Sequence, residues 1–256
     1  MELVDDQTAV VTGAASGNGR AIARTFAENG ADVVVADIQE EPRMEGRPTH
    51  ELINSETDSR ATYVNCDVSE KSDLQNVMAT ADEFGGIDIL VNNAGILNIV
   101  DFFEEDDEYQ QQMSINVDAV FYASQIAGMK MVENGGGSIV NISSVDAYFG
   151  DGRFVGYCTS KGAVKTMTYA LADALAPDVR VNAIHPGPIE TAQTTYDADL
   201  IGTEAEQERV KTIPVGRIGA PQDIANASLF LASDLADFVN ATSLLVDGGQ
   251  SNTHSH

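Results

Sequence analysis

Short apolar runs, separated by longer amphipathic stretches, make up most of the chain. Each run is apolar at consecutive positions, which is typical of parallel strands buried on both faces. This pattern predicts strands at 8–13, 32–37, 61–68, 87–95, 137–144, 179–187 and 242–249. The stretches 19–29, 69–84, 107–133 and 155–176 are long enough for helices. The repeated strand–helix order predicts an α/β fold with a doubly wound parallel sheet.

No linker, internal repeat or low-complexity segment interrupts this pattern. Residues 1–256 are therefore expected to form a single domain. The stretch 40–58, which contains two prolines and a glycine, is predicted as a loop before a helix. Residues 188–215 have few apolar positions and are predicted as a long, mobile flap. The polar tail 251–256 is also expected to be mobile.

The charge of the chain restricts its partners. Asp and Glu number 40 against 14 Lys and Arg, which gives a formal net charge of −26. Such a surface repels nucleic acids and anionic membranes. It also repels itself at low salt, because the screening length grows from about 3 Å at 1 M to about 10 Å at 0.1 M. We therefore expect a halophilic protein from a salty cytoplasm; the alternative is an acidic surface that serves ordinary solubility.

Neither a membrane span nor a disulfide framework is expected. No run approaches the roughly 18 apolar residues that a membrane helix needs. The start, "MELVDDQTAV", lacks the positive flank and apolar stretch of a secretory signal. Cys66 and Cys158 are too few for a disulfide framework, which favours a reducing cytoplasm. Cys158 is interpreted as a small packing residue and His185 as a packing or strand-end residue, not as reactive groups.

A glycine-rich turn, "VVTGAASGNGRAIA", joins the first predicted strand to the first helix. Gly13, Gly17 and Gly19 allow positive φ and a close approach of the backbone to a phosphate. The helix start offers free N–H groups and a partial positive charge. A plain tight turn is the alternative, but the strand–glycine–helix context favours dinucleotide binding. The next strand ends at Asp37, which can bond an adenosine ribose and repel a 2′-phosphate, so NAD is the expected cofactor.

Tyr157 and Lys161 are four residues apart and share one face of a predicted helix. A free phenol has a pKa of about 10. A neighbouring ammonium favours the phenolate and lowers that pKa. Tyr157 can then remove the proton of an alcohol or return it to a ketone. Ser144, after a strand end, can bond the substrate oxygen where charge develops; a surface helix contact is the alternative for the Tyr–Lys pair.

Eight short motifs occur in an order typical of one family. They are "TGAASGNG" (12–19), "CDV" (66–68), "NNAG" (92–95), Asn116, "SS" (143–144), "YCTSK" (157–161), "NAIHPGPIET" (182–191) and "VDGG" (246–249). Over about residues 6–250 the chain resembles the short-chain dehydrogenases/reductases. The resemblance implies a Rossmann-type fold, with a central seven-stranded parallel sheet and helices on both faces. Asn18, where the family often has an apolar residue, and the length of the loop at 40–58 are departures.

The resemblance also implies the site residues. The catalytic set would be Asn116, Ser144, Tyr157 and Lys161, with Asn116 holding a water that links Lys161 to solvent and Lys161 bonding the nicotinamide ribose. The matching cofactor contacts are Gly13, Ser16, Gly17, Asn18, Gly19, Asp37, Asp67, Val68, Asn93, Ala94, Gly95, Tyr157, Lys161, Pro186, Gly187, Ile189 and Thr191. No metal site is expected, because the tail histidines offer too few ligands.

The expected function is hydride transfer between NAD and a secondary alcohol or a sugar or polyol hydroxyl, or the matching carbonyl. Substrate contacts are expected from Ser144, Asp146 and Tyr157, because a carboxylate at Asp146 can accept bonds from neighbouring hydroxyls. A solvated loop carboxylate is the alternative for Asp146. One alternative function is a 3-ketoacyl-type reductase, which the net charge disfavours because acyl carriers are acidic. Another is a non-catalytic dinucleotide-binding protein, which the intact catalytic set disfavours.

The expected assembly is a homotetramer, and the alternative is a homodimer. Helices 107–133 and 155–176 are candidates for a four-helix contact, which the family commonly buries. The last strand, at 242–249, would pair across a second two-fold axis.

Overall fold

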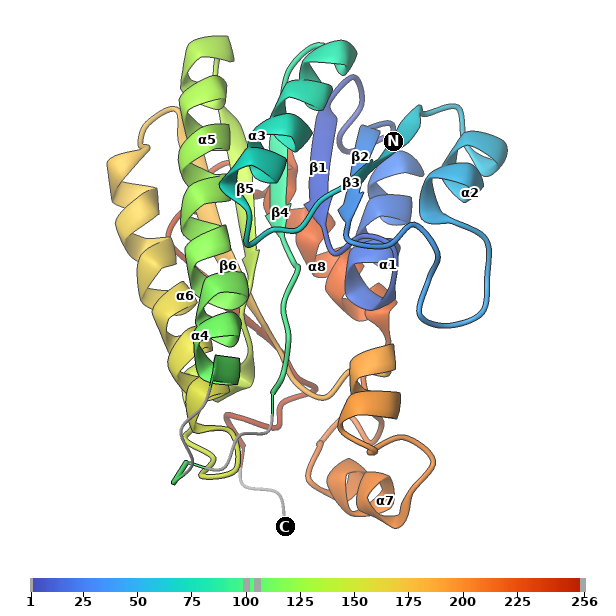
Figure 1. Cartoon of the computed structure of the whole chain (residues 1–256), viewed down its shortest axis with the longest axis vertical. Helices are drawn as coiled ribbons and strands as arrows, with labels where there is room; N and C mark the ends of the chain where they lie inside the picture. Colours follow the sequence, from blue (N-terminus) through green and yellow to red (C-terminus); the bar gives the residue numbers. More distant parts are fainter. Residues whose placement is uncertain (1, 99–101, 104–106, 254–256) are drawn as a thin grey trace.

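A computed structural model describes residues 2–98, 102–103 and 107–253. Seven parallel strands form one sheet in the order β3-β2-β1-β4-β5-β6-β7 (Figure 1). The strands are β1 (Thr8–Thr12), β2 (Asp32–Asp37), β3 (Ala61–Asn65), β4 (Ile89–Asn92), β5 (Gly137–Ile142), β6 (Val179–Pro186) and β7 (Ser243–Val246). Each lies within a strand predicted from the sequence. The Rossmann-type, doubly wound fold is thereby confirmed.

Helices cover both faces of the sheet (Figure 1). One face carries α1 (Gly17–Ala27), α2 (Thr49–Glu56) and α8 (Pro221–Ala232); the other carries α3 (Lys71–Thr80), α4 (Asp107–Met113), α5 (Ala119–Asn134) and α6 (Val155–Ala174). Consecutive strand residues point to opposite faces. Val11 therefore joins the core that contains Phe26 and Ile224, whereas Val10 joins the core that contains Leu74 and Met131. Two separate cores explain why the strands are apolar at every position.

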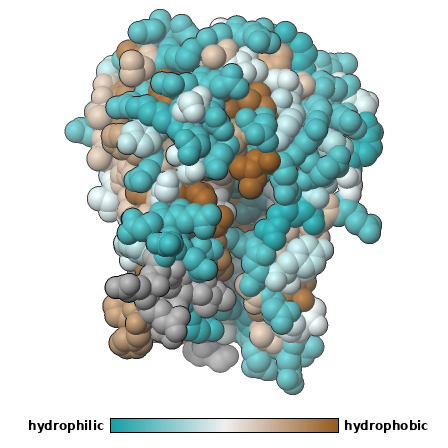
Figure 2. Space-filling model, viewed as in Figure 1, coloured by the Kyte–Doolittle hydropathy of each residue, from teal (hydrophilic) through white to brown (hydrophobic). Residues whose placement is uncertain are grey.

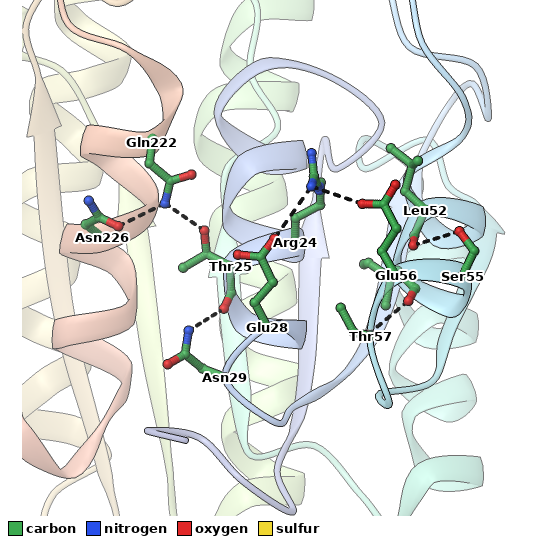
Figure 3. A network of polar contacts seen from close by, with 11 residues as sticks. Arg24, Thr25, Glu28, Asn29, Leu52, Ser55, Glu56, Thr57, Gln222 and Asn226 are labelled. Atoms are coloured by element: carbon green, nitrogen blue, oxygen red, sulfur yellow. Dashed lines mark hydrogen bonds and ion pairs between the residues drawn. The ribbon is translucent and has the colours of Figure 1, made fainter. Parts of the chain in front are cut away.

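Polar contacts tie α1 to the helices on either side of it (Figure 3). Arg24 Nη2 lies 3.3 Å from Glu56 Oε2 of α2. On the other side, Gln222 Nε2 of α8 donates to Thr25 Oγ1 at 2.9 Å. The three helices therefore hold together as a layer on this face of the sheet.

The predicted helix 107–133 is interrupted. A π-helical turn, Ser114–Asp118, separates α4 from α5. An apolar period of about 3.6 residues does not distinguish a continuous α-helix from one with a local π turn, so the sequence pattern missed it.

The two predicted loops are also partly helical. Within 188–215 the structure has a second π-helical turn, Gln193–Asp197, and the helix α7 (Glu204–Lys211). Helix α2 begins inside the stretch 40–58, because the buried Thr49 anchors it by donating to Ala14 O at 2.9 Å. Of the predicted tail, residues 254–256 lie outside the described residues.

The carboxyl ends of the parallel strands meet at one edge of the sheet. Gly13 follows β1, Asp37 ends β2, Asn93 follows β4 and Ser144 comes two residues after β5. Ligands of open α/β sheets bind at this edge. Across the part of the chain that the structure describes, no helix is both long and apolar enough to cross a membrane.

Candidate active site

A cavity of about 770 Å³ lies at the carboxyl ends of the strands. Figure 2 shows the same view of the molecule, where both hydrophilic and hydrophobic residues border a hollow near the centre. The predicted residues that line the cavity are Gly13, Ser16, Gly17, Asn18, Asp37, Asp67, Val68, Asn93, Ala94, Gly95, Ser144, Tyr157, Lys161, Pro186, Gly187, Ile189 and Thr191. Three predicted site residues, Gly19, Asn116 and Asp146, are not part of this lining. The cavity thus brings together residues from six of the predicted strand ends.

The glycine-rich turn is pressed against the end of β4. Gly13 has φ +65°, and a Cβ atom there would lie 2.9 Å from Asn93 Nδ2. Asn93 Nδ2 donates to Thr12 O at 2.9 Å, which holds the turn in place. A side chain at Gly19 would collide with the carbonyl oxygen of Gly13, so Gly19 serves the packing of helix on turn. The close packing explains why glycine is needed at both positions.

This end of the cavity fits a dinucleotide. Helix α1 begins at Gly17, so its free N–H groups are at the cavity wall. Asn18 Oδ1 is buried and has no hydrogen-bond partner among the described residues. A pyrophosphate with its ribose hydroxyls would supply both the negative charge and the donors that this end lacks.

Asp37 is held by the backbone at the same end. Its Oδ2 accepts a hydrogen bond from Ala15 N at 3.0 Å, and its Oδ1 accepts one from Gln39 N at 3.3 Å. Burial raises the pKa of the Asp37 carboxyl, and the backbone hydrogen bonds oppose that rise. The carboxylate is therefore fixed in the cavity wall, where a ribose hydroxyl can donate to it.

The sequence analysis missed a cation in this cavity. Arg43 reaches the cavity from the loop after β2. Arg43 N donates to Ser16 Oγ at 2.6 Å. Its guanidinium forms two hydrogen bonds with the Asp197 carboxylate, at 2.9 and 2.7 Å, and these lower the pKa of Asp197. The unusual length of the loop at 40–58 was the only sign of this contact in the sequence.

The opposite end of the cavity holds Tyr157 and Lys161 on one face of α6. Lys161 Nζ donates to Ile142 O at 3.1 Å and lies 5.5 Å from the centre of the Tyr157 ring. Burial lowers the pKa of Lys161 to about 8, and the charge of Asp146 partly opposes this shift. The predicted juxtaposition of phenol and ammonium is therefore present.

The pKa of Tyr157 moves in the direction opposite to the sequence expectation. Burial raises the pKa of the phenol, the charge of Asp146 raises it further, and hydrogen bonding with Ser144 lowers it. Lys161 does not produce the expected lowering, and desolvation, which penalises the phenolate, is the largest cause of the shift. The phenol of Tyr157 is therefore protonated at neutral pH, and its raised pKa makes it a weaker acid than a free phenol.

Ser144 and Asp146, which follow β5, form two hydrogen bonds with each other. Ser144 Oγ accepts from Asp146 N and donates to Asp146 Oδ2, each at 3.1 Å. Asp146 is half-buried, and burial raises the pKa of its carboxyl. The structure thus places Asp146 against Ser144 and behind the cavity wall, where it influences the site through Ser144 and through its charge.

Asn116 lies behind Gly95, in the π-helical turn. A Cβ atom at Gly95 would lie 3.2 Å from Asn116 Oδ1 and 3.4 Å from Lys161 Nζ, so both side chains converge there. Asn116 Oδ1 accepts from Ile96 N at 2.9 Å, and Asn116 Nδ2 donates to Ile96 O at 2.9 Å and to Ser160 Oγ at 3.1 Å. The side chain therefore braces the loop after β4 against α6. Single π turns of this kind are frequent at functional sites.

The two cysteines, Cys66 and Cys158, are in packed positions. Cys158 is half-buried, and its Sγ accepts a weak hydrogen bond from Asp151 N at 3.5 Å. Burial raises the pKa of the Cys66 thiol to about 12. Within the described ranges, no group of three or more His, Cys, Asp or Glu side chains could hold a metal ion.

Comparison with known proteins identifies a family with the same organisation. A family model described as "Enoyl-(Acyl carrier protein) reductase" matches residues 13–251. The NAD-dependent glycerol dehydrogenase of Listeria innocua is 35% identical, with 96% of this chain and 94% of that protein covered. The 3alpha-hydroxysteroid dehydrogenase of Mediterraneibacter gnavus is 37% identical, with 96% and 97% covered.

A solved structure agrees with these relatives. The putative NAD(P)-dependent gluconate 5-dehydrogenase of Beutenbergia cavernae, with bound NADP, superposes with a TM-score of 0.87 at 33% identity and covers 98% of both chains. We conclude that the chain belongs to the short-chain dehydrogenase/reductase family, whose oxidoreductases bind a nicotinamide dinucleotide.

Proposed function

We propose that this protein is an NAD-dependent dehydrogenase that acts on a secondary alcohol or on a sugar or polyol hydroxyl, or on the matching carbonyl. We also propose that residues 1–256 act as one dinucleotide-binding and catalytic domain. The observation that carries the proposal is the single cavity itself. Ser144, Tyr157 and Lys161 lie at one end of it, and the glycine-rich turn and Asp37 lie at the other.

In this mechanism Tyr157 handles the substrate proton. Its phenolic oxygen accepts the alcohol proton during oxidation and returns it to the carbonyl oxygen during reduction. Ser144 also lines the cavity; when a substrate binds, its hydroxyl turns from Asp146 Oδ2 to donate to the substrate oxygen and stabilises charge as it develops. The ammonium of Lys161, held by Ile142 O, stabilises the phenolate. When bound, the nicotinamide dinucleotide supplies the hydride acceptor or donor.

The preference for NAD over NADP rests on Asp37. Two backbone N–H groups hold this carboxylate in place, so it cannot turn away from a 2′-phosphate. Like charges in a partly buried site repel strongly. Arg43 in the same cavity could attract a phosphate, but Asp197 already pairs with its guanidinium. The sum of these charges favours a ribose with free hydroxyls.

A hydroxyl-rich substrate is supported by Asp146 and by the glycerol dehydrogenase among the relatives. Asp146 Oδ2 accepts a hydrogen bond from Ser144, and the negative charge of Asp146 behind the cavity wall favours hydroxyl donors beside Ser144. The alternative is a 3-ketoacyl-type reductase, which is supported by a 35% identical relative from Chlamydia pneumoniae, the 3-oxoacyl-[acyl-carrier-protein] reductase FabG. The net charge of −26 opposes docking of an acidic acyl carrier.

A panel assay tests this function. The purified protein is incubated in molar KCl with NAD or NADP and with glycerol, sugars, polyols, simple secondary alcohols and hydroxysteroids, and the reduced cofactor is followed by absorbance. We expect oxidation of compounds with vicinal hydroxyls, with NAD preferred. Turnover of acyl thioesters in the reverse direction, without turnover of any alcohol, would favour the alternative.

We further propose a cytoplasmic protein that is adapted to high salt. The charge of −26 repels itself over about 10 Å in 0.1 M salt and over about 3 Å in 1 M salt. Molar KCl is therefore expected to raise the melting temperature markedly over dilute buffer. A melting temperature that does not move with KCl would count against this adaptation.

A homotetramer is proposed from the exposed apolar side chains. Helix α5 presents Phe121, Tyr122, Met129 and Val132 to solvent, and Phe238, five residues before β7, is fully exposed. Apolar groups that are exposed in one protomer favour burial between protomers. Light scattering in molar KCl is expected to give four times the protomer mass of 27.2 kDa. A dimer is the alternative, and a monomer would reject both.

A further inference from the structure

His185 is fully buried on β6, behind the loop that carries Ser144. Its Nδ1 lies 2.9 Å from Ser144 O, and its Nε2 lies 2.9 Å from Ser243 Oγ of the edge strand β7. The Tyr148 ring packs edge-on against the imidazole, with 4.9 Å between ring centres. Both nitrogens therefore have partners, and the ring has no freedom to turn.

These partners fix the tautomer of His185. A carbonyl oxygen only accepts hydrogen bonds, so Nδ1 must carry the proton that it donates to Ser144 O. Burial lowers the pKa of His185, so the ring is neutral and Nε2 is an acceptor. Ser243 must then donate to Nε2.

The chain of hydrogen bonds continues outward from Ser243. Tyr169 OH of α6 lies 2.8 Å from Ser243 Oγ. Because Ser243 has given its only proton to His185, Tyr169 must be the donor in this contact. The half-exposed Tyr169 is thus linked through Ser243 and His185 to the backbone of Ser144.

The position of this contact matters because the sheet ends there. Ser143 N donates to Ile184 O at 2.8 Å, as part of the pairing of β5 with β6. The next donor along β6 would be Pro186, which has no N–H. Beyond Ser143, the hydrogen bond from the His185 side chain to Ser144 O holds this loop to β6.

We propose that His185 is a positioning residue for Ser144, which it holds through the backbone carbonyl, and that β7 contributes to the active site through Ser243. The proposal rests on the proposed function of Ser144. A catalytic hydroxyl that loses its orientation by a fraction of an ångström loses transition-state stabilisation but not cofactor contacts. The purely structural alternative is a histidine that fills a gap in the core.

Two substitutions at His185 separate these roles. In His185→Asn, the side-chain amide nitrogen occupies nearly the place of Nδ1 and keeps the donor to Ser144 O. In His185→Leu, a side chain of comparable bulk has no donor. We expect His185→Leu to lower kcat by about 10- to 100-fold, with an unchanged dissociation constant for the dinucleotide, and His185→Asn to keep kcat within about threefold. Tyr169→Phe, at the outer end, is the control and is expected to keep kcat within about twofold.

Equal kcat values for His185→Asn and His185→Leu would overturn the positioning role, because the donor would then make no difference. Weakened dinucleotide binding in His185→Leu would also overturn it, since the effect would not be confined to Ser144. Melting temperatures of both variants show whether each is folded.

The tautomer provides a test that needs no turnover. In the parent protein at neutral pH, nitrogen NMR of the imidazole, assigned by loss of the signal in His185→Asn, is expected to show a protonated Nδ1 and an unprotonated Nε2. A proton on Nε2 alone would overturn the proposal, because Nδ1 could not then donate to Ser144 O. If no alcohol is turned over by the parent protein, the proposed function fails, while this measurement still decides the contact.

Discussion

The two ends of the cavity are held in different ways. At the end near α6, the side chains of Lys161 and His185 are 5% and 0% exposed, and each bonds a backbone carbonyl in the interior. At the end near the glycine-rich turn, the Arg43 and Asp197 side chains are 43% and 37% exposed, and they bond each other across the mouth. One end is built from the core, and the other is closed by a surface ion pair.

This difference indicates that the two ends of the cavity have separate roles. Buried, fully bonded groups keep their geometry with or without a ligand, which suits groups that must meet a reacting atom. An exposed ion pair contributes only about 0–1 kcal/mol and is screened by salt. We therefore expect the inner end to govern turnover and the outer end to govern the affinity and choice of dinucleotide.

The largest expected effect is that of Tyr157→Phe. This change removes the only group proposed to transfer the substrate proton, and it leaves the glycine-rich turn and Asp37 untouched. Turnover is expected to fall by about 10³-fold, whereas dinucleotide binding stays within about threefold. Steady-state kinetics and a fluorescence titration measure the two. Turnover within tenfold of the parent would show that Tyr157 is not the acid–base group.

Lys161→Met is expected to separate activity from stability. Turnover falls by about 10²-fold, because the phenolate loses its counter-charge. Burial lowers the pKa of Lys161 from 10.5 to about 8, so the buried charge costs stability below pH 8. Its replacement is therefore expected to raise the free energy of unfolding at pH 7 by about 1–3 kcal/mol, reduced by the contribution of the lost hydrogen bond to Ile142 O.

The stability difference between the parent and Lys161→Met is expected to depend on pH. Between about pH 8 and 10.5 the native parent releases the Lys161 proton and the unfolded chain keeps it. The stability of the parent should therefore rise relative to that of Lys161→Met across this window, and urea unfolding at pH 7 and pH 9.5 would show the gap closing. A constant gap would contradict the lowered pKa.

At the outer end, Asp37→Ser is expected to change cofactor choice. It removes the charge that opposes a 2′-phosphate, so the ratio of kcat/KM with NAD to kcat/KM with NADP should fall about tenfold or more. The kcat at saturating NAD should hardly change, because Asp37 lies at the far end from Tyr157. Equal kcat/KM with both dinucleotides in the parent would refute the role of Asp37.

The two ends also differ in how well the sequence predicts them. Tyr157 and Lys161 are one helical turn apart, and Gly13 to Gly19 are a single local motif, so short-range patterns suffice for both. Arg43 and Asp197 are 154 residues apart, and His185 is 41 residues from Ser144, so only the fold brings them together. The π-helical turn at Asn116 was not predicted because a single such turn is too short to be seen in an apolar period that extends along a whole helix.

The smallest effect is expected from the ion pair at the mouth. Arg43→Gln should change the dissociation constant of NAD by about two- to fivefold in dilute buffer and by less in molar KCl, because salt screens an exposed pair. Asp197→Asn is the matched control, since it breaks the same pair and leaves Arg43 free to meet a phosphate; it should favour NADP. A change in kcat larger than the change in affinity would contradict the division between the two ends.

The double variant Tyr157→Phe/Asp37→Ser tests that division most directly. The change in binding free energy of NAD and of NADP on Asp37→Ser is measured by titration in the parent and in the Tyr157→Phe background. Independent sites add, so the two changes should agree within about 0.5 kcal/mol. A coupling above about 1 kcal/mol would contradict the account, because the two ends of the cavity would then act as one.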